Sequence, residues 1–198
     1  MESGPAASGR SQLQSGRSNA KAKRMDDWAA GYTQSELDQA QERYGVRFPP
    51  DLTALLLERR PVRGYNWSVD DPRIREMLAW PTDMLLFHVD NGLWWPEWGE
   101  RPVQQDARHE IVRDAVRQAP RLVPVLSHRF IPETPSESGN PIFSMYGFDT
   151  IYYGADLVEY FVNEFGGMHG VGAVRHIPFW SDLAEGHARV FTGAPYVR

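Results

Sequence analysis

Residues 33–57 read TQSELDQAQERYGVRFPPDLTALLL, and this stretch decides the first part of the fold. Its opening residues, Thr33-Gln-Ser-Glu36, form a capping box, in which each end side chain can bind a free backbone amide at a helix start. Gly45 is placed to end this helix, because glycine adopts the left-handed backbone conformation at little cost. We therefore expect a helix between Thr33 and Gly45. Its apolar stripe consists of Leu37, Ala40 and Tyr44.

A second helix is expected directly after a short extended step at residues 46–48. Pro49, Pro50 and Asp51 open it, since proline is tolerated in the first turn of a helix. Residues 59–61, Arg-Arg-Pro, end it. The buried face of this helix consists of Leu52, Leu55 and Leu56.

The rest of the chain predicts helices and strands in an irregular order. A polar loop is expected at residues 132–140, and a strand hairpin turns around Gly147. The helix expected after the hairpin turns Leu157, Tyr160, Phe161 and Phe165 inward. The expected helices are 72–80, 103–119, 157–165 and a short final one after Pro178; the expected strands are 84–89, 121–126, 142–146 and 150–153.

This order does not alternate in the way that builds a parallel doubly wound sheet. The sequence therefore predicts an α+β fold, with a mostly antiparallel or mixed sheet flanked by helices. We expect one domain at residues 28–198. Residues 1–27 are expected to form a disordered basic tail, because they contain almost nothing to bury.

Composition and charge argue against direct nucleic-acid binding and against a membrane protein. The chain has 198 residues, no cysteine and a net charge of −5. Residues 1–24 hold five basic residues against one glutamate, a charge of +4, so the remainder carries −9. An acidic body argues against direct nucleic-acid binding, which needs clustered Lys and Arg. No stretch suits a membrane span or a secretory signal, so we expect a cytoplasmic protein with no membrane partner.

Three tryptophans distinguish residues 92–100, which read GLWWPEWGE. Pro96 and Gly99 exclude a helix interior or a central strand here. The rings of Trp94, Trp95 and Trp98 can pack as a wall of the fold, or they can form a contact surface, since tryptophan is enriched in binding hot spots. The sequence leaves both interpretations open.

Candidate catalytic groups are few. Motifs of serine hydrolases, zinc proteases and phosphate-binding loops are missing from the sequence. His88 and Asp90 would share one face of the expected strand, and His128 could complete a metal site with them. His128 and Arg129 follow a strand, where an arginine can clamp an anion or tie the next loop to the body. We expect no cofactor.

Two segments resemble the SUKH superfamily, named after the Smi/Knr-type cell-wall regulators and including many bacterial toxin-immunity proteins. Residues 33–57 are similar to its entry helix pair. Residues 139–165, GNPIFSMYGFDTIYYGADLVEYFVNEF, are similar to its terminal hairpin and helix. The chain departs from the family at residues 59–64, RRPVRG, where an Asn-Gly-Gly step is usual. The resemblance implies a binding module, and the family has no established catalytic residues to carry over.

These observations predict a non-catalytic protein-binding domain, an immunity protein that neutralises a basic toxin domain by covering its active surface. Two alternatives stay open: a metal-assisted hydrolase that uses His88, Asp90 and His128, and a regulatory scaffold with no toxin partner. The expected partner contacts are Trp94, Trp95, Glu97, Trp98, Glu100, His128 and Arg129.

Overall fold

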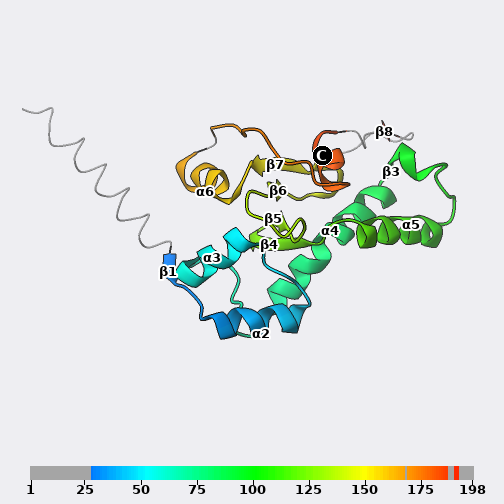
Figure 1. Cartoon of the computed structure of the whole chain (residues 1–198). Helices are drawn as coiled ribbons and strands as arrows, with labels where there is room; N and C mark the ends of the chain where they lie inside the picture. The colour runs from blue at the N-terminus through cyan, green and yellow to red at the C-terminus, as the bar shows by residue number, and fades with distance from the viewer. Residues whose placement is uncertain (1–27, 168, 187–189, 192–198) are drawn as a thin grey trace, which may run out of the picture.

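A four-stranded antiparallel sheet lies at the centre of the protein (Figure 1). The structure, a computed structural model, describes residues 28–167, 169–186 and 190–191. The expected tail at residues 1–27 lies outside this part of the chain. In spatial order the strands are β4 (Leu122–Leu126), β5 (Arg129–Pro132), β6 (Ile142–Ser144) and β7 (Ile151–Gly154).

Two small antiparallel ladders lie outside this sheet. β1 (Trp28–Ala30) pairs with β2 (Arg59–Pro61), and β3 (Leu93–Trp94) pairs with β8 (Val190–Phe191). Together with the helices they give a single-domain α+β fold, as predicted. The α-helices are α2 (Gln34–Tyr44), α3 (Pro50–Glu58), α4 (Pro72–Asp90), α5 (Gln105–Gln118), α6 (Leu157–Gly166) and α7 (Trp180–Ala184). The short 3-10 helices are η1 (Pro96–Trp98) and η2 (Gly147–Asp149).

The expected entry helix pair is confirmed. Thr33 caps α2 by accepting a hydrogen bond from the amide of Glu36, and Glu36 binds the Thr33 amide in return. Gly45 ends α2 with a φ of 63°. α3 begins at Pro50 and ends at the step to Arg59. The buried residues of the pair are Leu37, Ala40, Tyr44, Leu52 and Leu56.

The strand expected at residues 84–89 is wrong. α4 instead runs without a break from Pro72 to Asp90 and contains Pro81 inside it. The helix expected at residues 72–80 stops just before Pro81, a residue that lacks the amide needed to continue the hydrogen-bond ladder. Tertiary packing overrides this local cost, since apolar residues on both sides of Pro81 continue one helical stripe. The buried members are Ile74, Pro81, Leu85, His88 and Val89.

The downstream elements are predicted in part. The hairpin is confirmed, with η2 between β6 and β7. β5 was missed: its last residue, Pro132, is the first residue of the polar loop expected at residues 132–140. The inward face of α6 also differs from the prediction. Leu157, Tyr160 and Asn163 are buried, whereas Phe161 and Phe165 are only partly buried.

Buried apolar residues form two clusters, and α4 connects them. Ile74 belongs to the cluster with α2, α3 and Tyr160, and Leu85 belongs to the cluster with the tryptophan segment and α7. Figure 1 shows α4 running from the α2 end of the molecule to the end where α5 and β3 lie. None of the helices in the described ranges combines the length and apolar character needed to cross a bilayer.

Candidate functional site

The tryptophan segment is divided between the core and the surface. Trp94 is 3% exposed and Trp95 is 4% exposed. The indole nitrogen of Trp94 donates a hydrogen bond to the carbonyl of Gly99 at 2.8 Å, and the Trp95 ring lies 5.2 Å from that of Phe179. These two side chains are therefore walls of the fold, and in this structure they offer a partner almost no surface.

Trp98 is different, because it lines a groove of about 440 Å³. Its half-buried ring packs against Trp94 at 5.2 Å and against Phe148 at 6.0 Å, which holds it in place. Glu97 and Glu100 beside it are exposed. The other residues of the groove are Ile111, Asp114, Ala115 and Gln118 of α5, its C-cap Ala119, and Pro178 and Phe179.

Phe179 closes this groove in an unusual backbone conformation. Its φ is 71°, a value that a bulky residue adopts only at a cost of about 1–2 kcal/mol. The ring contacts that offset this cost are with Trp95 and with Trp180, the latter at 4.7 Å. Sequence patterns could not reveal this wall, because Phe179 is brought to Trp98 only by the tertiary fold.

His128 and Arg129 lie at the turn from β4 to β5, and Arg129 is occupied by contacts within the protein. Its guanidinium lies 3.9 Å from the centre of the Tyr153 ring and donates to the Ser144 hydroxyl at 2.9 Å. Its Nε is 3.5 Å from a carboxylate oxygen of Glu164 on α6. These contacts tie the turn to β6, β7 and α6, whereas the sequence suggested that the pair ties the loop at residues 132–140 to the body.

The hydrogen bonds of His128 define its tautomer. The Nη1 group of Arg129 donates to His128 Nε2, so the ring proton lies on Nδ1, which faces the Ser127 hydroxyl at 3.2 Å. Burial lowers the pKa of His128, and the charge of Arg129 lowers it further, which favours the neutral ring. In this tautomer Nδ1 donates to the Ser127 hydroxyl.

A second pocket, of about 570 Å³, lies beside this turn and was not predicted. Tyr65 lines it and donates a hydrogen bond to the carbonyl of Ser127 at 2.6 Å. Ser127 has a φ of 49°, so this bond fixes a left-handed turn. Charges of both signs surround the pocket: Arg63, Arg73, Glu76 and Glu164.

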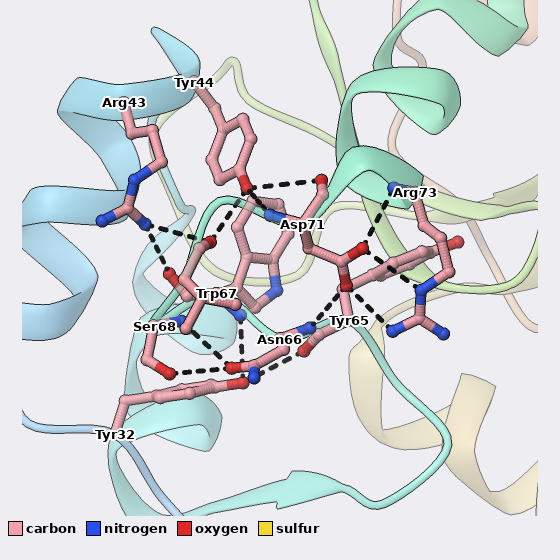
Figure 2. A network of polar contacts seen from close by, with 10 residues as sticks. Tyr32, Arg43, Tyr44, Tyr65, Asn66, Trp67, Ser68, Asp71 and Arg73 are labelled. Atoms are coloured by element: carbon pink, nitrogen blue, oxygen red, sulfur yellow. Dashed lines mark hydrogen bonds and ion pairs between the residues drawn. The ribbon is translucent and has the colours of Figure 1, made fainter.

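The loop that carries Tyr65 is held rigidly by polar contacts, which Figure 2 shows. The Tyr44 hydroxyl donates to the carbonyl of Val69 at 3.0 Å and accepts from the amide of Asp71 at 2.8 Å. Asp71 caps α4 and pairs with Arg73 at 2.8 Å, and hydrogen bonds from Arg73 lower the pKa of its carboxyl. Sequence patterns could not reveal these contacts, because the partners come from α2 and α4.

The proposed pairing of His88 and Asp90 is wrong, because both lie on a helix, where side chains two residues apart point in different directions. Nδ1 of the buried His88 accepts a hydrogen bond from the backbone amide of Phe148 at 2.9 Å. Asp90 binds Nε2 of His109 at 2.9 Å and joins α4 to α5. Throughout the described ranges, no three His, Asp or Glu side chains gather closely enough to hold a metal ion.

Comparison with known proteins adds no relative. No protein-family model, curated protein or solved structure matches the chain significantly. The site is therefore defined by its geometry. Trp98, Glu97 and Glu100 lie at the end of the molecule with α5, whereas Arg129 contacts β7 and α6, so the predicted contacts divide between two surfaces.

Proposed function

We propose that the protein is a non-catalytic protein-binding domain of the SUKH type, which acts in the cytoplasm as an immunity protein. In this proposal it neutralises a toxin by covering the toxin's active surface. The observation that carries it is the groove at Trp98. A firmly packed indole lines an open groove there, with two exposed carboxylates next to it.

The chemistry of this surface suits a basic protein partner. Tryptophan offers a large contact area at a low entropic cost, and hot spots of protein interfaces are enriched in it. Glu97 and Glu100 would attract a basic surface and speed its encounter with the groove. A toxin that acts on nucleic acid has a basic substrate cleft, and an acidic surface can occlude such a cleft.

The experiment begins with the reading frames that neighbour this gene. A basic toxin-like domain encoded there is produced with the full chain, and growth protection and the Kd of the complex are measured. We expect Trp98→Ala to weaken binding by at least about 30-fold, the effect of losing a hot spot of about 2 kcal/mol. Growth protection should be lost with it.

Phe87→Ala is the matched control, because Phe87 is an aromatic residue that is 47% exposed on α4 and lies outside the groove. It should protect as the wild type does. A Trp98→Ala protein that keeps its fold by circular dichroism and still protects fully would remove this surface from the proposal.

A further inference from the structure

Helix α6 has two apolar stripes, and only one of them is covered. Leu157 and Tyr160 are buried in the core. The second stripe repeats at the spacing i, i+3, i+4, i+7, which places its members on one face of a helix. Val158 is 74% exposed and Val162 is 51% exposed. The members of this second stripe are Val158, Phe161, Val162 and Phe165.

This second stripe forms one wall of a groove of about 940 Å³, and α3 forms the other wall with Ala54 and Leu55. Trp28 of β1 lies across the groove with its ring edge-on to Phe161 at 5.1 Å and to Phe165 at 5.9 Å. Helices α3 and α6, far apart in sequence, thus both line this groove. Figure 1 shows the two helices on the same side of the molecule. Apolar grooves between two helices are suited to a third helix.

The rim of the groove is acidic. Three carboxylates line it, those of Asp51, Glu58 and Asp156, against one basic side chain, Arg59. The guanidinium of Arg59 lies 4.7 Å from the Trp28 ring and 3.9 Å from Glu58, so these two charges offset each other and Asp51 and Asp156 leave the rim negative. An occupant of this groove therefore needs an apolar face for the floor and basic residues along its flanks.

We propose that the α3–α6 groove binds an amphipathic helix of a partner protein, one that carries Lys or Arg on both sides of its apolar face. The charges argue against a second copy of this chain. A symmetric self-contact would place Glu58, Asp51 and Asp156 of one copy against the same acidic rim of the other. Anionic lipid surfaces are disfavoured for the same reason. The groove shares no residue with the Trp98 groove, so this inference goes beyond the proposed function and does not depend on it.

The test uses the full chain and a fluorescent peptide of about five helical turns, with leucine at the apolar positions and lysine at the others. Anisotropy measures its Kd at low salt. A matched peptide with glutamate in place of every lysine is the charge control. We expect the lysine peptide to bind and the glutamate peptide to bind at least about tenfold more weakly.

Two variants locate the binding site. Val162→Lys should weaken binding of the lysine peptide by at least about tenfold, because it adds a repelling charge within the apolar stripe. Val103→Lys is the matched control, since Val103 is 87% exposed and lies outside the groove. It should leave the Kd within about twofold. Trp98→Ala should also leave it unchanged, which separates this inference from the proposed function.

Three results would overturn the proposal. The first is equal binding of the lysine and glutamate peptides. The second is equal binding by the wild type and Val162→Lys. The third is a concentration-dependent dimer in sedimentation that Val162→Lys makes monomeric, which would assign the groove to a second copy.

Discussion

At the scale of one residue, burial determines the protonation state of His88 and thereby its role. Its side chain is fully buried, Nδ1 accepts the Phe148 amide, and its ring stacks on that of Phe148 at 6.1 Å. Desolvation lowers its pKa, with a small opposing effect from Asp149. The ring is therefore neutral in the folded protein at neutral pH and serves as an acceptor that holds η2 on α4.

This lowered pKa predicts a dependence of stability on pH. In the unfolded chain the pKa of a histidine is about 6.5, so below that pH the unfolded state binds a proton that the folded state excludes. The contribution of neutral His88 to the free energy of unfolding is therefore complete above pH 6.5. It is lost as the pH falls toward the pKa of His88 in the folded state, and the free energy of unfolding then changes by up to about 1.4 kcal/mol per pH unit. Urea unfolding between pH 7.5 and 5.5 measures it.

His88→Gln should flatten this slope, because glutamine does not titrate and its amide oxygen can still accept from Phe148. Part of the slope should remain, since the pKa of His128 is lowered as well. If His88→Gln and the wild type lost stability in parallel, the folded pKa of His88 would not be lowered.

At the scale of elements, the contact between η2 and α4 depends on Gly147. Its φ is 56°, and a β-carbon there would lie 2.6 Å from His88 Nδ1 and 2.7 Å from the carbonyl oxygen of Met84. Both distances are too short for a real contact. The close approach of these two elements therefore requires glycine on steric grounds as well as conformational ones.

Gly147→Ala should lower the free energy of unfolding by about 2–4 kcal/mol, from left-handed strain and overpacking together. Gly139→Ala is the matched control, because its φ is 82° and nothing lies within 4 Å of the added β-carbon. It should cost only about 1 kcal/mol, for strain alone. Denaturant unfolding of both variants gives the difference, and equal costs would show that the contact is loose.

How far the sequence predicts each element depends on how local its determinants are. The capping residues of α2 lie in its first turn or directly beside its ends, so Thr33, Glu36 and Gly45 predict where the helix begins and ends. The second half of α4 was expected to be a strand, because the packing that continues the helix past Pro81 comes from other elements. β1 and β2 were missed because each has three residues and forms only by pairing with the other.

The candidate site was predictable only in outline for the same reason. The sequence identifies the aromatic residues of segment 92–100, but it cannot show which rings are exposed. Phe179 and Phe148, far along the chain, bury two faces of this cluster and leave Trp98 at the groove. The α3–α6 groove was hidden because Phe161 and Phe165 were expected to face the core.

At the scale of the whole molecule, α4 passes through both apolar clusters and should make them unfold together. Ile74 is fully buried in one cluster and Leu85 is fully buried in the other. Ile74→Ala and Leu85→Ala should each cost about 2–5 kcal/mol. Each should shift one common transition, followed by far-UV circular dichroism and tryptophan fluorescence. Separate transitions for the two signals in either variant would show that the clusters are independent.

The order of the central sheet places β4 at one side, where a strand could in principle recruit another chain. Pro124 lies in the middle of β4, and the register shifts between Pro124 and Leu126. A strand that paired with β4 there would lack the amide donor that proline does not have and would meet the shifted register beside it. The edge of β4 is therefore poorly suited to pairing with another chain. The edge formed by β4 thus disfavours the repeated addition of strands that leads to fibrous aggregates.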